Sequence, residues 1–373
     1  MIEVREVKTR KEKKDFLNFP LKLYKNNPYF VPPLYGDEKK IFRKDYVYLD
    51  QSEAVYYNAY LDGKMVGRIS GIIQHASNKK ENTKRVRFTR FDSIDNQEVA
   101  NALFSKVEKW AKEKGMDTIV GPLGFSDLER EGLLIEGFDQ LSTFEEQYNY
   151  DYYQRLIETY GFVKEIDWTE RKLYLPDEED DRLKRISDKM LKRFNLRYGT
   201  AKNTKDFIKK YADKFFDIID ITYNHIYGSV PFTPGMRKMM IQNFNLIVDL
   251  KNVAVILDEN DRVVCFGICF PSIAKSVQKC QGKLTPIGAL RVLWEIKHPT
   301  VIDLGLIGVL PEYAMKGVSS SIISTISKML KYPNIDHIET NLTLETNISI
   351  INQFKSFKTV QHKRRRSFVK KID

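Results

Sequence analysis

Residues 300–323 read Thr-Val-Ile-Asp-Leu-Gly-Leu-Ile-Gly-Val-Leu-Pro-Glu-Tyr-Ala-Met-Lys-Gly-Val-Ser-Ser-Ser-Ile-Ile, and this stretch decides the fold. Its apolar first part predicts a buried strand that ends at Pro311. The segment 316–320, Lys-Gly-Val-Ser-Ser, then leads directly into an amphipathic helix. The first amides of a helix have no acceptor inside it, and the helix dipole favours an anion there. The sequence therefore predicts a strand, a turn and a helix start that can hold phosphate.

The composition fits a folded protein of two domains. The chain has 373 residues, of which 42% are hydrophobic, and that length is comfortable for two cores. No segment approaches the run of about 20 apolar residues that spans a bilayer. The N-terminus lacks the apolar core of a signal peptide, so we expect a cytoplasmic protein. Its three cysteines lack zinc-ligand spacing and predict reduced thiols, with no metal site.

The net charge of +11 permits an anionic partner, or it reflects lysines spread over solvated faces. The basic run at 363–366, Lys-Arg-Arg-Arg, is the one place that invites a nucleic-acid hypothesis. Strand alternation would send Arg364 and Arg366 to one face and Arg365 to the other, which splits the patch. No aromatic platform or recognition helix accompanies it. We therefore expect a solvated edge strand and no nucleic-acid partner.

The order of elements occurs twice along the chain. Each half is predicted to run strand, helix, hairpin, strand, helix, strand, helix and closing strands, which indicates tandem α+β domains. The charge-dense segment 177–186 is the predicted linker between a domain at 1–176 and a second at 187–373. The predicted strands cover 2–8, 56–61, 65–73, 85–91, 117–120 and 162–175, then 196–199, 254–257, 263–270, 301–310, 337–342 and 359–370. The predicted helices cover 11–24, 96–115 and 152–160, then 206–223, 284–297, 319–330 and 348–355.

Two motifs of the second half resemble the GNAT (Gcn5-related N-acetyltransferase) superfamily. The first is the run 309–319, where Val-Leu-Pro-Glu-Tyr precedes Ala-Met-Lys-Gly-Val-Ser. The second is the strand that reaches Asn341, the helix near 350–357 and the basic closing strand at 364–368. The whole chain is also similar to uncharacterised bacterial tandem-GNAT proteins through segments 19–24, 28–34, 121–122 and 132–138. The resemblance implies two acyl-CoA N-acyltransferase folds, each a mixed, mostly antiparallel twisted sheet flanked by helices.

The resemblance also implies a site for acetyl-CoA or another acyl-CoA as co-substrate. Backbone groups of Ile307 and Val309 would bind the pantetheine arm and the thioester carbonyl. Asn347 would contact the cofactor, although capping its own helix explains it equally well. The pyrophosphate would lie on backbone amides of the loop, namely Lys316, Gly317, Val318, Ser319 and Ser320. Ala314 and Ser319 depart from the family's Arg/Gln and final Gly, which leaves backbone donors to do the binding.

Acyl transfer to an amine also needs a proton acceptor and a proton donor. Alternation predicts Asp303, Gly305, Ile307 and Val309 on one face of the strand. By resemblance, Asp303 matches the glutamate base of the histone-acetyltransferase branch; alternatively it merely starts the strand or caps a neighbour.

Many family members carry a tyrosine general acid where this chain has Phe354. The leaving thiolate would then take its proton from water, Tyr313 or Tyr223, or the site has lost its activity. In the first half the corresponding loop, Asp-Ser-Ile-Asp-Asn at 92–96, is acidic. We therefore predict that the N-terminal domain binds no coenzyme A.

The leading hypothesis is an N-acyltransferase, monomeric or homodimeric, that acts on an amine or an amino-acid-like small molecule. The acceptor is expected in a groove between the domains, lined by segments 28–33 and 122–147. A catalytically degenerate pair that binds acyl-CoA or a metabolite is one alternative, supported by Ala314 and Phe354. Fem-like aminoacyl transfer from charged tRNA is another, although the long helical arm of that family is missing.

Overall fold

The computed structural model describes residues 1–176, 182–247, 249–314 and 316–372. Residues 177–181 of the predicted linker lie outside the described residues, and 182–186 open helix α6 (Arg182–Arg193). Within the described ranges, no helix has the length and apolar character needed to cross a membrane.

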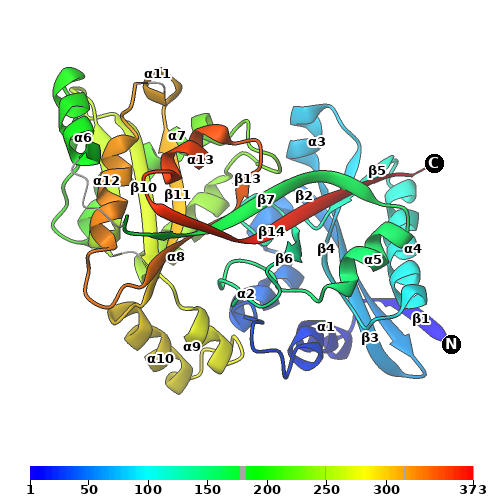
Figure 1. The fold of residues 1–373 in the computed structure, drawn as a ribbon. Helices are drawn as coiled ribbons and strands as arrows, with labels where there is room; N and C mark the ends of the chain where they lie inside the picture. The colour runs from blue at the N-terminus through cyan, green and yellow to red at the C-terminus, as the bar shows by residue number, and fades with distance from the viewer. Residues whose placement is uncertain (177–181, 248, 315, 373) are drawn as a thin grey trace.

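One continuous sheet runs through the molecule (Figure 1). Its order is β1-β2-β3-β4-β5-β14-β7-β12-β11-β10-β9-β8, with β6 beside β14 and β13 beside β7. The first-half strands are β1 (Ile2–Glu6), β2 (Ser52–Leu61), β3 (Lys64–Gln74), β4 (Arg85–Ser93), β5 (Thr118–Gly121), β6 (Leu133–Glu136) and β7 (Val163–Tyr174). The second-half strands are β8 (Arg197–Tyr198), β9 (Val253–Leu257), β10 (Val263–Pro271), β11 (Val301–Val309), β12 (His337–Thr340), β13 (Thr343–Leu344) and β14 (Lys358–Lys371).

Helices flank the sheet in both halves, as the sequence predicts. Those of the first half are α1 (Arg10–Leu23), α2 (Tyr35–Glu38), α3 (His75–Glu81), α4 (Gln97–Glu113) and α5 (Tyr152–Thr159), with short 3-10 turns at 39–42 and 47–50. Those of the second half after α6 are α7 (Thr204–Thr222), α8 (Pro234–Ile247), α9 (Ala274–Lys279), α10 (Pro286–Lys297), α11 (Pro311–Ala314), α12 (Ser320–Met329) and α13 (Ile348–Phe354), with a 3-10 turn at 250–252.

Local sequence explains the clearest of these helices. Asn96 caps α4 by accepting a hydrogen bond from the Val99 amide at 3.1 Å. Val99, Leu103 and Val107 then bury one face of α4 against the first-half core. Gly115 follows the last turn of the helix, and its φ of +72° is a conformation that favours glycine.

The last strand of each half pairs with strands of the other half. β7 belongs to the first half of the chain, yet it pairs with β12 and β13. β14 closes the chain, yet it pairs with β5 and β6 as well as along the length of β7. Figure 1 shows β7 and β14 running together across the middle of the molecule. A domain division at 177–186 stays a prediction about the chain, because the sheet itself is not divided there.

The exchange extends into the two main hydrophobic cores. Phe368 and Ile372, near the C-terminus, are buried among first-half residues under α4. Leu173 of β7 is buried among second-half residues such as Ile338. Each core is therefore completed by a strand from the other half.

This arrangement predicts the effect of truncating Phe368, which is 0% exposed. Phe368→Ala should lower the free energy of unfolding by about 3–5 kcal/mol, since it removes a buried ring from a closed core. Val360→Ala is the control on the same strand, because Val360 is 48% exposed. Urea unfolding measures both variants. A cost below about 1 kcal/mol for Phe368→Ala would mean that β14 does not complete the first-half core.

Candidate functional site

The pivotal strand β11 separates from β12 partway along its length. The two strands pair only over Val301–Leu304, and the amide of Asn341 then donates to the Leu304 carbonyl at 3.2 Å. On the other edge, Leu304 lies opposite Cys269 and Leu306 opposite Ile268, so Gly305 is the extra residue of a β-bulge. Beyond this bulge, none of the described strands pairs with β11 on the β12 side. The edge of β11 over 305–309 that faces away from β10 therefore has no described strand beside it, and we call this edge the opening.

The bulge overturns the prediction that Asp303 and Ile307 share a face. Asp303 lies opposite Phe270 on β10, whereas Ile307 lies opposite Gly267. Residues 267 and 270 are three positions apart on β10 and therefore point to opposite faces. The inserted residue, Gly305, reverses the alternation that the sequence alone implies.

The two faces look toward different elements. A Cβ on Gly267 would lie 2.4 Å from Ile322, so the face of Ile307 is covered by α12. On the other face the ring of Phe270 packs edge-on against Phe144, at 6.2 Å between centroids. Asp303 therefore faces the side of the sheet approached by the first-half loop that carries Phe144.

The loop before α12 has three successive amides without an acceptor in the described part of the chain. Gly317, Val318 and Ser319 donate no backbone hydrogen bond to any residue in the described ranges, whereas the amides of 320–323 bond back into the turn. Gly317 has a φ of +72° and so suits glycine. The hydroxyl of Ser320 is buried and finds no acceptor or donor within the described chain. This arrangement can accept an anion, as predicted for pyrophosphate.

Lys316 adds positive charge to the same loop. Its Nζ lies 5.3 Å from the ring centroids of both Tyr313 and Phe194. Partial burial raises the pKa of Tyr313. About 20 Å of strand, at about 3.3 Å per residue, separates Asp303 from Val309, and Tyr313 lies beyond it. The two predicted catalytic residues are therefore not brought together.

Other predicted residues fall into clear positions. Tyr223, which follows α7, donates a hydrogen bond from its hydroxyl to the carbonyl of Ile307 at 3.1 Å. Ile307 lies in the part of β11 that does not pair with β12. Asn347 caps α13 by accepting from the Ile350 amide at 3.3 Å. Phe354 is buried in the second core. A cofactor contact for Asn347 stays a prediction.

The basic run at 363–366 is not an edge strand, which corrects that prediction. β14 lies between β5 and β7 in the sheet, and the side chains of Lys363 and Arg365 are 0% exposed. The alternation was predicted correctly, since Arg366 points the other way and forms two hydrogen bonds with Asp167, at 2.8 and 3.0 Å.

Lys363 and Arg365 enter a buried ion cluster that joins three strands. Lys363 Nζ lies 3.2 Å from Glu170 on β7 and hydrogen-bonds Glu339 on β12. Arg365 Nε donates to the other oxygen of Glu170 at 2.6 Å. Although burial opposes it, the Lys363 charge holds the pKa of Glu339 well below its usual range. Both carboxylates are therefore ionised at neutral pH.

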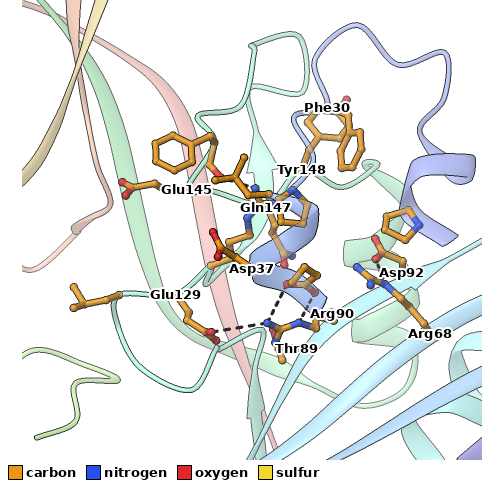
Figure 2. Close-up of a pocket in the computed structure, with 17 residues that line it drawn as sticks. Phe30, Asp37, Arg68, Thr89, Arg90, Asp92, Glu129, Glu145, Gln147 and Tyr148 are labelled. Carbon is orange, nitrogen blue, oxygen red and sulfur yellow. Dashed lines mark hydrogen bonds and ion pairs between the residues drawn. The ribbon is translucent and has the colours of Figure 1, made fainter. Parts of the chain in front are cut away.

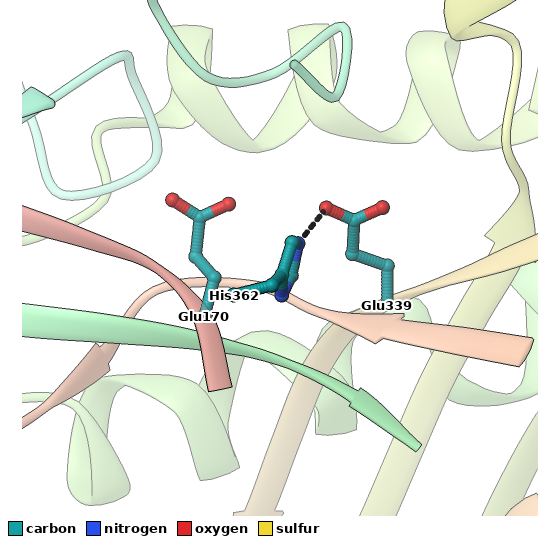
Figure 3. A group of neighbouring side chains, drawn as sticks. All are labelled: Glu170, Glu339 and His362. Atoms are coloured by element: carbon teal, nitrogen blue, oxygen red, sulfur yellow. Dashed lines mark hydrogen bonds and ion pairs between the residues drawn. The ribbon is translucent and has the colours of Figure 1, made fainter. Parts of the chain in front are cut away.

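Glu170, Glu339 and His362 form a possible metal-ligand group (Figure 3). His362 Nε2 lies 2.7 Å from the nearer oxygen of Glu339. The ammonium of Lys363 already contacts both carboxylates, and the Arg365 guanidinium on Glu170 supplies the second positive charge that balances them. This group is therefore best explained as an internal ion network.

A cavity of about 230 Å³ lies between the first-half sheet and the loops that reach the second half (Figure 2). Its lining includes Phe30 and Pro33 from one segment and residues 128–130, 144, 145, 147 and 148 from another. Both overlap the segments 28–33 and 122–147 predicted for an acceptor groove. All residues that line this cavity lie within 20–148, however, so it is a cavity of the first half and not the predicted groove between the domains. The cavity is strongly charged, with arginines at 68, 90 and 130 and carboxylates at 37, 38, 92, 129 and 145.

Arg90 reaches this cavity from a second bulge. In β4, Thr89 lies opposite Ser70 while Asp92 lies opposite Arg68, so β4 carries one extra residue there. Arg90 has a φ of +50°, which is strained for an arginine. Its guanidinium binds Glu38, with Nε at 2.6 Å from the carboxylate. The bulge in β4 thus directs a charged side chain into the cavity. The bulge in β11 carries Gly305, which has no side chain.

Glu145 connects the cavity with the opening beside β11. No sequence pattern predicts a role for it. It lines the cavity, and its Oε2 lies 3.5 Å from Nδ2 of Asn341, the residue that follows β12. Burial raises its pKa to about 7, and Arg130 limits that rise. Its only signal in the sequence was its place in the loop 122–147. Loop position alone does not distinguish it from its neighbours.

Asp303 lies in the same carboxylate neighbourhood. Burial raises its pKa well above the usual range, and the charges of Glu339 and Glu145 raise it further. The Ser272 hydroxyl is close enough to temper this rise but lacks hydrogen-bond geometry, so neither oxygen of Asp303 has a partner among the described residues. The environment therefore favours the protonated form of Asp303, whereas the pKa of Glu145 is raised to about 7.

Arg130 is the cavity cation without a carboxylate ion pair among the described residues. One of its nitrogens donates to the Phe144 carbonyl at 2.5 Å. Burial lowers its pKa to about 10, so it stays charged at neutral pH. Its guanidinium keeps capacity to bind a polar or anionic group in the cavity.

Comparisons with known proteins agree with this architecture. No family model matches the chain. Protein YghO of Escherichia coli K12 is 27% identical over 382 aligned positions, covering 99% of this chain and 95% of that protein. A bacterial ceramide synthase of Caulobacter vibrioides is 26% identical over 302 positions, covering 79% of this chain and 77% of that protein.

Among solved structures, a tandem GNAT protein from the clavulanic acid biosynthesis pathway superposes with a TM-score of 0.54. The match covers 100% of this chain and 99% of that one, at 9% identity. The chain therefore has the tandem GNAT fold, and the predicted fold class is confirmed.

The ion cluster predicts a large cost for removing Lys363. Lys363→Met should lower the free energy of unfolding at pH 7 by about 3–5 kcal/mol, because two buried carboxylates lose their cation. Lys370→Met is the control, since Lys370 lies on the same strand as Lys363 but at a partly exposed position, where it pairs with Glu108 of α4. This substitution should cost about 1 kcal/mol or less.

The pH dependence of this cost has a definite sign. The folded-state pKa of Glu339 is depressed, so its contribution is present above the unfolded pKa near 4.5 and is lost as pH falls. The deficit of Lys363→Met should therefore shrink below pH 4.5 in urea unfolding. Equal costs for the two lysine variants would contradict a cluster that depends on Lys363.

Proposed function

We propose that the chain is an acyl-CoA-dependent N-acyltransferase. Acyl-CoA binds in the opening between β11 and β12, and an amine acceptor binds in the cavity of the first half, next to this opening. The single observation that carries this proposal is Glu145, which lines the cavity and contacts Asn341 at the point where β11 and β12 separate. Donor and acceptor would meet at this carboxylate.

The donor would be held mainly by backbone groups. The amides of 317–319, which bond to no acceptor among the described residues, suit the pyrophosphate, and Lys316 adds charge beside them. Backbone groups of Ile307 and Val309, past the bulge, suit the amides of the pantetheine arm. Backbone binding explains how the site can tolerate Ala314 where the family has Arg or Gln.

The reaction requires two proton movements. The amine nitrogen attacks the thioester carbonyl, the C–S bond breaks, and the thiolate of coenzyme A leaves. Glu145, with a pKa of about 7, is suited to take the proton from the amine. Burial raises the pKa of Asp303 well above its usual range, so this side chain is suited to give a proton to the thiolate, although the family resemblance assigns it the role of base.

The acceptor is expected to be an amine that also carries polar groups. The cavity offers Arg130 and a set of carboxylates for hydroxyl, amine or acidic groups. One relative of this chain is named as a ceramide synthase, and a ceramide is an amide of an amino alcohol. That name supports amide formation and an amino-alcohol-like acceptor.

The second candidate function is binding of acyl-CoA or a metabolite by a protein that no longer catalyses acyl transfer. Phe354 favours it, since this position supplies no proton to the leaving thiolate. Ligand stabilisation without acyl release over a panel of amines would support binding alone.

Gly317 tests the donor site. Coenzyme A at 100 times its Kd should stabilise the protein by about 2.7 kcal/mol, seen as a rise in Tm. Gly317→Val should abolish this rise, because a β-branched residue strains a backbone at φ +72° and displaces the loop. Gly115→Val is the matched control, since Gly115 has the same φ and lies after α4. A full rise in the Gly317 variant would place coenzyme A elsewhere.

Glu145 tests the chemistry. The kcat/KM of the wild type should rise with pH through about 7, as Glu145 loses its proton. Glu145→Gln should lower kcat/KM by about 10²–10⁴-fold and remove this inflection, while the coenzyme A shift in Tm persists. Asp303→Asn should slow turnover and keep the inflection near pH 7. An inflection that moves only in Asp303→Asn would assign the base to Asp303 instead.

A further inference from the structure

Helix α10 presents an apolar face that the rest of the described chain does not cover. Ile287, Leu290, Leu293 and Trp294 are each between 52% and 66% exposed, and Leu284 before the helix is 53% exposed. At 100° per residue the four helical positions fall on one side of α10. The opposite side, with Gly288, Val292 and Ile296, packs toward α9. The exposed stripe is therefore additional to the face that holds the helix in the fold.

Basic side chains surround this stripe. α9, α10 and their connection carry five exposed cations, none of them in an ion pair with a described carboxylate: Lys275, Lys279, Lys283, Arg291 and Lys297. The one acidic residue of segment 274–298, Glu295, accepts the Ser276 amide at 2.8 Å. The α9–α10 unit thus combines an exposed apolar stripe with five exposed positive charges, which we call its rim.

The α9–α10 unit is fixed to the wall of the cavity. Gln278 Nε2 donates to the carbonyls of Pro28 and Phe30 at 2.9 and 3.0 Å, and the Tyr35 amide donates to the Gly282 carbonyl at 2.8 Å. Phe30 itself lines the cavity. In Figure 1, α9 and α10 project together from the lower side of the molecule, next to α2. A partner bound to α10 would therefore lie close to the proposed acceptor site.

We propose that the exposed face of α10 docks the protein on a membrane surface that contains anionic lipids. The helix has 12 residues and is about 18 Å long. It would lie flat in the interfacial layer of the bilayer and would not cross it. Leucine and isoleucine insert among acyl chains, tryptophan prefers the interface, and lysine and arginine reach the headgroups. The charge of the rim selects a lipid surface over a second copy of this basic chain, since two such rims would repel each other.

The test is co-sedimentation of the full chain with phosphatidylcholine vesicles, with and without phosphatidylglycerol. The wild type should pellet with the anionic vesicles and release as salt is raised. Leu290→Glu/Trp294→Glu should lower the bound fraction by about tenfold or more. Ile221→Glu is the matched control, because Ile221 is 43% exposed on α7, and it should bind as the wild type does. Lys279→Glu/Lys283→Glu should weaken binding and its salt dependence.

Tryptophan emission gives a second measurement. Trp168 is buried and Trp110 is partly buried, so a vesicle-induced blue shift reports Trp294. Trp294→Phe should keep binding and lose the shift. Absent or charge-independent binding, or wild-type binding by the double glutamate variant, overturns the proposal. A wild-type dimer that the double variant abolishes, without vesicle binding, assigns the face to a second copy. No acyl donor is present, so docking and acyl transfer can fail separately.

Discussion

The buried ion cluster between β7, β12 and β14 is the interaction on which the architecture depends. Glu170 comes from the first half of the chain, while Lys363 and Arg365 come from its last strand. A buried charge is tolerable only when its partner is in place, so neither half can desolvate its charged strand alone. The exchange of β7 and β14 between the halves is thus fixed by electrostatics as well as by the cores that Phe368 and Leu173 complete.

Both halves use a bulge in the corresponding strand, to different ends. In β11 the extra residue is Gly305, where a Cβ would lie 2.5 Å from Phe270, so the strand can bend away and leave backbone groups open. In β4 the bulge carries Arg90, whose side chain is directed into a cavity and held by Glu38. A β-bulge therefore frees a strand edge in the second half, and a β-bulge directs a charged side chain into the cavity in the first half.

The proposed chemistry depends on where the two halves meet. A first-half loop brings Glu145 to the end of β12, and the same loop packs Phe144 against β10 beside Asp303. The two carboxylates differ in their charged neighbours: the pKa of Glu145 is raised to about 7 and is limited by Arg130, whereas that of Asp303 is raised well above its usual range by burial and by Glu339. A pair of groups whose pKa values are pushed apart in this way can divide the roles of proton acceptor and proton donor.

The sequence by itself determined the repeated element order, the tandem GNAT fold and the loop at 316–320, because each rests on local patterns of a few residues. It also named two of the segments that line the cavity, but not the strands β3 and β4 that supply Arg68 and Arg90. It did not determine the bulge at Gly305, since a bulge depends on the register with β10, and this reversed the predicted face of Asp303. Nor did it place the basic run in the interior, because the partners of Lys363 lie about 24 and 193 residues away in the chain. Only the tertiary structure brought Glu145 to Asn341, since that contact joins loops 196 residues apart, and no local pattern records such a distance.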